Sequence, residues 1–198
     1  MSQLLETIKC KDGKLYNLNK HNFRFNKARK EYIGLSDVID LNEIIEIPEN
    51  CKKGLFRCRV VYSKTIEKIE FIPHQFRIIR SLKLVEDNEI DYNFKFAKRE
   101  KLQKLFEQHA NCDDIIIVKN GCITDSFTAN LIFFDGVKWW TPDTPLLQGT
   151  QRRFLIDESR IFECRITTND LHKYKKVGLI NAMWNLEDMP IVSTKNIQ

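Results

Sequence analysis

The stretch of residues 113–152 constrains the fold most, because apolar runs alternate in it with short turns. The runs Ile115 to Val118 and Leu131 to Phe134 are rich in β-branched and aromatic residues, and they are separated by Asn120-Gly121. Asp135-Gly136 follows the second run. Apolar runs of this length, punctuated by Asn-Gly and Asp-Gly, predict antiparallel strands joined by tight hairpins.

Two polar features of this stretch form a candidate site. The run that begins at Cys122 carries a lone acid, Asp125. Further on, Gly149 precedes a segment with a helical pattern. Backbone N–H groups at such a helix start can approach an anion, so this turn is a candidate phosphate site.

Length and charge bound the class of protein. With 198 residues the chain suits one large domain or two small ones, and it is long enough to bury a core. The formal net charge is +5, and the lysines and arginines are scattered among the acids instead of forming a block. Such a balance suits small anionic ligands as readily as nucleic acid. Because no aromatic-basic platform or binding motif appears, we expect no nucleic acid partner.

Cysteine spacing and apolar runs suggest the compartment. The six cysteines show no CxxC pair and no Cys/His ligand spacing. This favours thiols in a reducing compartment over a zinc site or a disulfide framework, so we expect no metal. The opening MSQLLETIKC lacks the apolar core of a signal peptide, and no apolar run reaches membrane-spanning length. We therefore expect a cytoplasmic protein with no membrane partner.

The first half of the chain has the pattern of an α+β unit. Residues 4–10 predict a strand, and residues 15–18 its hairpin return after the Asp12-Gly13 turn. Residues 19–32 predict a helix with Asn19 as its cap, and residues 37–45 a short helix. Strands are expected at 54–62, 64–71 and 77–85. The acidic piece 86–92 has the composition of a linker, which divides the chain into a small N-terminal domain (1–91) and a larger C-terminal domain (92–198).

Five basic residues in the first hundred positions carry alternative interpretations. His21 and Arg24 lie three apart on one helical face, which is equally the pattern of a solvated basic face. Arg57 and Arg59 project to the same side of a strand and could bind carboxylates, or face solvent without a ligand. Lys95 lies between two phenylalanines. An apolar setting lowers the pKa of a lysine and makes it nucleophilic, but most such lysines extend their ammonium to water.

Five motifs in order resemble the class IV aminotransferases, the fold type IV pyridoxal-phosphate enzymes that include aminodeoxychorismate lyase. The motifs are ETIKCKDGKLYNLNKHNFRF, KFAKR, ITDSFTANLIF, TPDTPLLQGTQR and LINAM. The arginine four residues after Lys95 and the N-A-M loop resemble the lyase branch. The resemblance implies an α+β, D-amino-acid aminotransferase-like fold with two α/β subdomains and the site at their junction.

The resemblance also implies a cofactor, pyridoxal 5'-phosphate, and a role for each matching residue. Lys95 would carry the Schiff base and shuttle protons, Asp125 would hold the proton on the pyridine nitrogen, and Leu147 would pack against the ring. The phosphate would be bound by five residues: Arg24, Thr150, Gln151, Asn181 and Ala182. A carboxylate at the ring nitrogen and a dianion held by an arginine and two amide-presenting loops are what this chemistry requires.

The expected activity is elimination of pyruvate from 4-amino-4-deoxychorismate to give p-aminobenzoate, with Arg57 and Arg59 on the substrate carboxylates. The alternatives are transamination of a branched-chain or D-amino acid, and a non-catalytic derivative of the fold. Asp125 stands where relatives commonly carry Glu, Lys98 where many have Asn, and the glycine-rich substrate loop is absent after Tyr62. Relatives form dimers, so the resemblance implies a homodimer.

Overall fold

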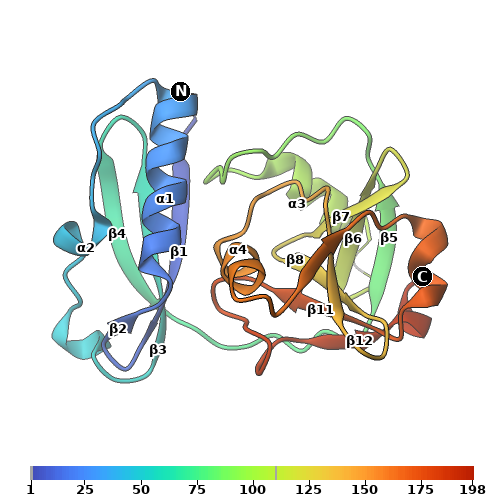
Figure 1. The fold of residues 1–198 in the computed structure, drawn as a ribbon. Coiled ribbons are helices and arrows are strands. Elements are labelled where there is room, and N and C mark those ends of the chain that lie inside the picture. Colours follow the sequence, from blue (N-terminus) through green and yellow to red (C-terminus); the bar gives the residue numbers. More distant parts are fainter. Residues whose placement is uncertain (1, 110) are drawn as a thin grey trace. The chain divides into compact units, whose positions relative to one another are not determined.

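The computed structural model describes residues 2–109 and 111–198, and these form two compact units. Unit 1 consists of Met1–Phe76 and Phe94–Lys98, and unit 2 of Arg77–Asn93 and Arg99–Gln198 (Figure 1). Within the described residues, no helix has both the length and the apolar character needed to cross a membrane. The predicted boundary between residues 91 and 92 remains a prediction.

Unit 1 is an antiparallel sheet with the strand order β2-β1-β3-β4 and one long helix, α1. Its elements are β1 (Leu4–Lys11), β2 (Lys14–Leu15), α1 (Leu18–Ala28), a π-helical turn (Arg29–Ile33), α2 (Leu41–Ile44), a 3-10 turn (Glu49–Cys51), β3 (Leu55–Tyr62) and β4 (Ile66–Pro73). Asp12 and Gly13 both have positive φ (48° and 74°), as the predicted Asp-Gly hairpin requires.

The helices of unit 1 correct three sequence-based boundaries. The return strand contains only Lys14–Leu15, because Asn17 adopts a left-handed conformation (φ 53°) and α1 begins directly after it. Asn17, not Asn19, therefore precedes the helix. The predicted helix at 37–45 is only α2, which Asp40 caps by accepting a hydrogen bond from Asn42 N (2.8 Å).

The core of unit 1 lies between α1 and one face of the sheet. Phe25 and Ala28 of α1 are buried together with apolar residues of β1 and β3, namely Leu4, Ile8, Cys10, Cys58, Val60 and Tyr62. Since side chains alternate along a strand, Thr7, Lys9, Arg57 and Arg59 belong to the opposite face. The predicted alternation of β3 is thus confirmed.

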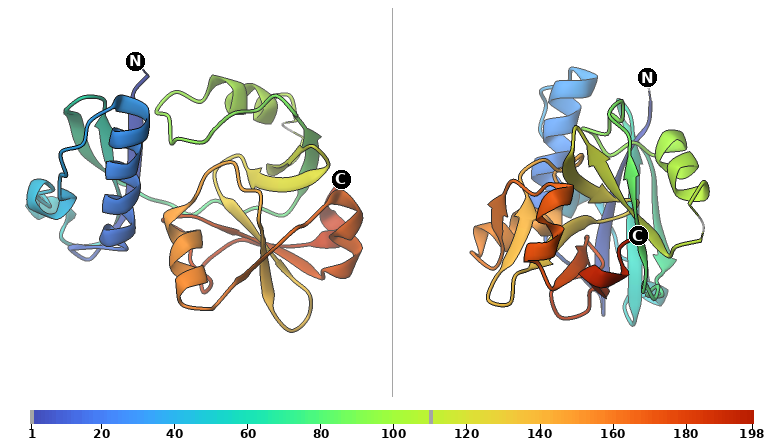
Figure 2. Two further views of the ribbon diagram at one scale, coloured as in Figure 1. Left: turned by 45° about the horizontal axis from the view of Figure 1, so that its top comes forward. Right: turned by 90° about the vertical axis from the view of Figure 1, so that its right-hand side faces the viewer.

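Unit 2 is built on a larger, mixed sheet with the order β10-β9-β8-β7-β6-β5, to which β11 and β12 are added beside β8. Its elements are β5 (Leu82–Glu86), α3 (Glu100–Glu107), β6 (Asp114–Lys119), β7 (Cys122–Ser126), β8 (Asn130–Phe134), β9 (Trp139–Pro142), α4 (Thr150–Asp157), β10 (Phe162–Cys164), 3-10 turns (Thr168–Lys173 and Thr194–Asn196), β11 (Lys176–Ile180) and β12 (Ile191–Ser193). Figure 2 shows α3 and α4 on either side of these strands.

The hairpins predicted from the central stretch are present in unit 2. Asn120 and Gly121 join β6 to β7 with positive φ (50° and 74°), and β8 pairs antiparallel with β7, β9 and β11. The strand predicted at 77–85 differs from the prediction in its pairing. Leu82–Glu86, expected beside the N-terminal strands, instead pairs in parallel with β6.

Candidate functional site

Asp125 lies in β7 and is almost fully buried, with 6% of its surface exposed. Its Oδ1 accepts a hydrogen bond from Asn130 Nδ2 (2.7 Å), and its Oδ2 accepts one from the backbone N–H of Leu147 (2.9 Å). The carboxylate therefore joins β7 to β8 and to the loop that precedes α4.

Burial raises the pKa of Asp125 to about 6, although the hydrogen bonds from Leu147 and Asn130 and the charge of Arg152 act in the opposite direction. The buried carboxylate thus has two hydrogen-bond donors but incomplete charge compensation. A cationic group, such as a protonated ring nitrogen, would stabilise its ionised form.

This pKa predicts a pH dependence for the cofactor-free protein. A carboxyl group whose pKa is raised by folding contributes stability at pH values below its pKa in the unfolded state. That contribution is lost as the pH rises through its pKa in the folded state. The melting temperature of Asp125→Asn, measured relative to that of wild type, should therefore be higher at about pH 8 than at about pH 4. Thermal unfolding of both apoproteins at the two pH values measures this, and a difference that does not change with pH would contradict it.

Asn130 connects the parts of this site. Its Nδ2 also donates to the carbonyl of Leu147 (2.9 Å), and it lies opposite Ile180 in the β8–β11 pair. Gly149 approaches it so closely that a Cβ there would lie 1.8 Å from Asn130 Oδ1. In the sequence Asn130 stands five residues after Asp125, within the motif ITDSFTANLIF, and no role was predicted for it. Its signal was that spacing across a tight turn.

The start of α4 presents backbone amides next to Gly149. The first helical hydrogen bond runs from Arg153 N to Gly149 O (2.9 Å), so the amides of the first turn point out of the helix start. Thr150 and Gln151 are both buried there. Arg152 has a structural role, because it is buried and bonds Glu163 (2.6 Å) and the carbonyl of Pro142 (2.8 Å).

The second predicted loop follows β11 and is fixed by the Asn181 side chain. Its Oδ1 accepts hydrogen bonds from Met183 N (2.9 Å) and Trp184 N (3.1 Å), and its Nδ2 donates to Thr128 O (3.3 Å). Ala182 is half-buried between these residues. Because Ile180 pairs with Asn130, this loop and the start of α4 converge on the same asparagine.

Unit 1 holds Lys95 against the start of β1. The Lys95 carbonyl accepts from Leu5 N (2.8 Å), and the flanking phenylalanines both pack against Tyr32, with ring centroids 5.3 Å apart in each pair. The Lys95 side chain is half-buried. Its backbone and both neighbours are thus fixed, as a lysine with a defined position requires.

A buried polar cluster joins β1 to α1 in the same unit. Glu6 is fully buried, and its Oε1 accepts from Arg24 Nε (2.8 Å) while its Oε2 accepts from Arg24 Nη2 (2.6 Å) and lies 2.6 Å from His21 Nδ1. Burial lowers the pKa of His21, and the charges of Arg24 and Lys95 lower it further against the effect of Glu6. His21 and Arg24 therefore face the protein interior and not solvent.

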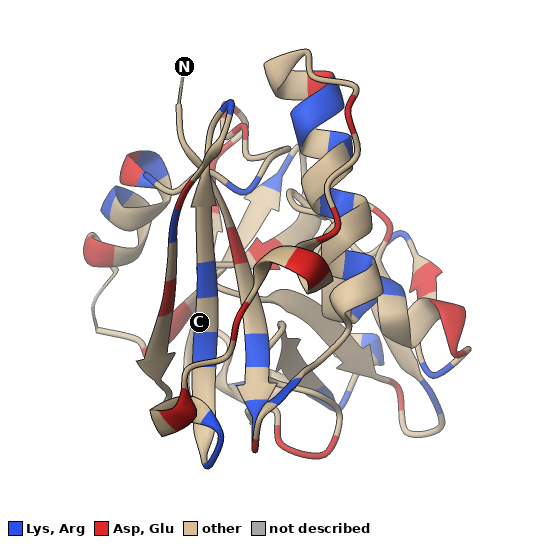
Figure 3. Cartoon of the chain, turned by 90° about the vertical axis from the view of Figure 1, so that its left-hand side faces the viewer, with Lys and Arg blue, Asp and Glu red and all other residues tan. Residues whose placement is uncertain are grey.

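The two predicted substrate arginines differ in their surroundings. Arg59 pairs with Glu70 (2.6 Å), which also pairs with Lys68 (2.5 Å). The Nε of Arg57 is buried and has no hydrogen-bond partner among the described residues. Lys9, only 8% exposed, lies opposite Arg57 in the β1–β3 pair. Figure 3 shows basic positions on neighbouring strands of this sheet.

Lys9 is a candidate that the sequence analysis missed. The alternation of β1 placed it on the face of Thr7 and Arg57, but the strand was considered only for its family motif. Arg57 Nε has no hydrogen-bond partner among the described residues and lies on a strand position opposite Lys9. An anionic group bound there would accept hydrogen bonds from both side chains.

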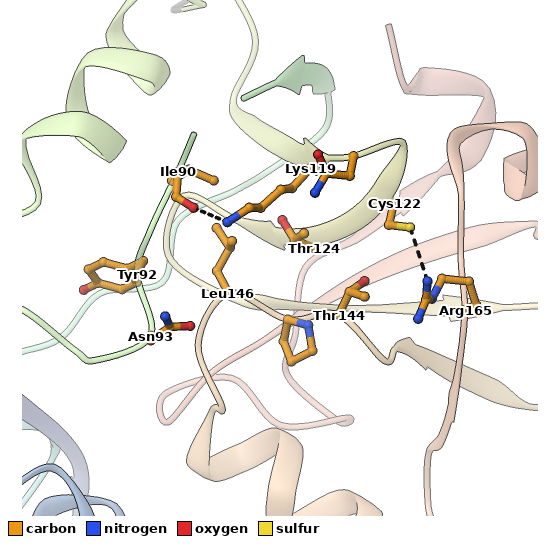
Figure 4. A pocket seen from close by; sticks show the side chains of 11 residues that line it. Ile90, Tyr92, Asn93, Lys119, Cys122, Thr124, Thr144, Leu146 and Arg165 are labelled. Carbon is orange, nitrogen blue, oxygen red and sulfur yellow. Dashed lines mark hydrogen bonds between the residues drawn. The ribbon is translucent and has the colours of Figure 1, made fainter. Parts of the chain in front are cut away.

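A pocket of about 330 Å³ lies on the other face of β7, where Thr124 and Cys122 point (Figure 4). Lys119 donates to Ile90 O (2.6 Å) at its wall, and Arg165 Nη1 lies 3.8 Å from the Cys122 thiol. None of the predicted site residues lines this pocket. Among the described residues, no cluster of His, Cys, Asp or Glu could hold a metal ion.

Comparison with known proteins identifies the family. The sequence pattern of the amino-transferase class IV family matches residues 3–193. The chain belongs to the class IV aminotransferase family. An uncharacterized protein from Haemophilus influenzae is 39% identical to this class IV enzyme over 185 residues, which cover 92% of this chain and 98% of the relative.

Solved structures similar to this class IV enzyme agree. A proposed 4-amino-4-deoxychorismate lyase from Haemophilus somnus 129PT is 36% identical, with a TM-score of 0.87 over 94% of this chain and 98% of that one. A hypothetical aminotransferase from Mycobacterium tuberculosis in its pyridoxal-phosphate-bound form has a TM-score of 0.78 at 15% identity, over 96% of this chain and 80% of that one.

The predicted α+β fold of the D-amino-acid aminotransferase type and the predicted enzymatic class are therefore confirmed. The cofactor predicted from the sequence, pyridoxal 5'-phosphate, is the one bound in this Mycobacterium tuberculosis aminotransferase. The residues of unit 2 fit this cofactor, because the incompletely compensated Asp125 suits a protonated pyridine nitrogen and the first-turn amides of α4 after Gly149 suit a phosphate.

Proposed function

We propose that this enzyme eliminates pyruvate from 4-amino-4-deoxychorismate and forms p-aminobenzoate. The observation that carries the proposal is the 36% identity to the proposed lyase from Haemophilus somnus, which extends over nearly the full length of both chains. The Arg99 of KFAKR and the N-A-M loop, both features of the lyase branch, support it.

The proposed roles of the residues follow from their chemistry. When bound, pyridoxal phosphate supplies an electron sink for the negative charge left when a bond next to the substrate amine breaks. Asp125 would hold a proton on the ring nitrogen, and Leu147 would pack against the ring. Lys95 Nζ would supply the covalent amine and then take a proton from the substrate ring as pyruvate leaves. The proposed phosphate ligands are Arg24, Thr150, Gln151, Asn181 and Ala182.

One assay distinguishes this activity from the transamination of a branched-chain or D-amino acid. The lyase releases pyruvate from aminodeoxychorismate without any acceptor, in amounts equal to p-aminobenzoate. A transaminase forms a keto acid only when a second keto acid is present. Pyruvate release that requires an acceptor would overturn the proposal and favour transamination.

We further propose that Arg57 binds a substrate carboxylate and that Arg59 contributes less, because Glu70 already compensates its charge. Arg57→Met is expected to raise KM for aminodeoxychorismate by about tenfold, since a charge-assisted bond of ~1.4 kcal/mol is lost. Arg59→Met should change KM less. Steady-state kinetics of the two variants test this, and an unchanged KM in Arg57→Met would remove Arg57 from the substrate site.

The remaining expectations concern partners and compartment. We propose a homodimer that acts in the cytoplasm on a small amino substrate bearing a carboxylate. The family resemblance supports the dimer, and the cysteine pattern supports a reducing compartment. Sedimentation equilibrium of the holoenzyme tests the dimer, and a mass equal to one chain would contradict it.

A further inference from the structure

Both oxygens of the Glu6 carboxylate bind side chains of α1. Oε1 accepts from Arg24 Nε, and Oε2 accepts from Arg24 Nη2. His21 Nδ1 lies 2.6 Å from Oε2. An ionised carboxylate can only accept, so this imidazole nitrogen carries the proton. One buried acid on β1 thus holds two helix residues that lie one turn apart.

The charges of this cluster are well defined. Burial acts to raise the pKa of Glu6, but Arg24 and His21 together lower it to about 2. Burial foremost lowers the pKa of His21. The nearby Tyr62 phenol has a raised pKa because of burial and the Glu6 charge. At neutral pH the cluster therefore contains ionised Glu6, cationic Arg24, neutral His21 and neutral Tyr62, with the charge of Lys95 nearby.

We propose that Glu6 is a positioning residue that fixes the guanidinium of Arg24 for the phosphate of the cofactor, with His21 as the second anchor of the carboxylate. This inference rests on the phosphate-binding role proposed for Arg24.

The geometry gives the reason. An arginine side chain has many rotamers, and ordering it when the phosphate binds costs conformational entropy. Pairing through both Nε and Nη2 fixes the plane of the guanidinium before the cofactor arrives, and the hydrogen bond to His21 keeps Glu6 itself from turning. Without this carboxylate, the partly buried Arg24 guanidinium would be an uncompensated charge, which costs more than the pair.

A purely structural pair would stabilise unit 1 without distinguishing between ligands. The test is therefore the affinity of the apoprotein for pyridoxal phosphate compared with pyridoxal, which has the same ring and lacks the phosphate. For Glu6→Gln we expect pyridoxal phosphate to bind about tenfold more weakly and pyridoxal to change by less than about twofold. Absorbance titration of the cofactor measures both affinities.

Glu70→Gln is the matched control, because Glu70 also pairs with an arginine of this sheet, Arg59. It should leave the affinity for pyridoxal phosphate unchanged. If Glu6→Gln does not fold, Glu6→Asp allows the same comparison, since it keeps the charge and withdraws it by one methylene. If the Glu6 variant loses affinity for pyridoxal phosphate and for pyridoxal by the same factor, the inference is wrong.

A double-mutant cycle with Arg24→Met separates the two proposals. If Glu6 acts through Arg24, the phosphate-specific effect of Glu6→Gln disappears in the Arg24→Met background. If Arg24→Met weakens pyridoxal phosphate and pyridoxal equally, the proposed role of Arg24 is wrong. If Arg24→Met is specific for the phosphate and Glu6→Gln is not, Arg24 keeps its role and the positioning role of Glu6 is wrong.

Discussion

Replacing Lys95 with alanine is expected to lower turnover by more than about 10³-fold, because the proposed chemistry uses this one amine for the covalent link and for proton transfer. The cofactor should still bind, since the phosphate ligands and Asp125 are unchanged, but it should dissociate on gel filtration. Steady-state kinetics and the absorbance spectrum of the bound cofactor, before and after filtration, measure the two effects.

Lys98→Ala is the matched control for this variant. Lys98 lies three residues further along the same segment and is exposed, so its loss removes a similar charge without touching the proposed site. Its turnover should be close to that of wild type. A Lys95→Ala enzyme with more than about a tenth of wild-type turnover would show that another group performs the proton transfer.

Gly149→Ala is expected to weaken pyridoxal phosphate binding by at least about tenfold, although the backbone at this position (φ −69°) accepts any L-residue. The added Cβ would lie 1.8 Å from Asn130 Oδ1. Relieving that overlap displaces the asparagine, whose Nδ2 bonds Asp125 Oδ1 (2.7 Å) and Leu147 O (2.9 Å). The effect therefore reaches both the ring-nitrogen side and the phosphate side of the proposed site.

Gly178→Ala tests whether this effect is local to the site. A Cβ at Gly178 would meet the flexible end of Met189, with its sulfur at 2.7 Å, within the core of unit 2. This variant should lose stability of about 1–3 kcal/mol and keep its affinity for the cofactor. Denaturant unfolding and cofactor titration of both variants provide the comparison. If Gly149→Ala and Gly178→Ala bind pyridoxal phosphate with equal affinity, the role given to Gly149 is wrong.

The hairpins and alternating strands could be predicted from sequence because their causes are local. Asp12-Gly13 and Asn120-Gly121 both adopt the positive φ values that tight hairpins need. The alternation in β3 was sufficient to separate the arginine face from the buried face. The start of α4 after Gly149 was likewise visible, because glycine followed by a helical pattern is a local signal.

The features that the sequence analysis missed depend on partners distant in the chain. The parallel pairing of β5 with β6 joins strands about thirty residues apart, and no local pattern specifies it. Glu6 was noted only as part of a family motif, whereas its partners His21 and Arg24 come from a helix 15 and 18 residues away. The compensation of Arg59 by Glu70 depends on the register between β3 and β4.

Borohydride reduction of the holoenzyme followed by peptide mapping tests the central claim most directly. Reduction makes the link between cofactor and amine permanent, so the labelled lysine can be identified by its mass. We predict a single label on Lys95, together with loss of the visible absorbance band. A label on another lysine, or none at all in protein that retains its cofactor, would contradict the assignment on which the proposed chemistry rests.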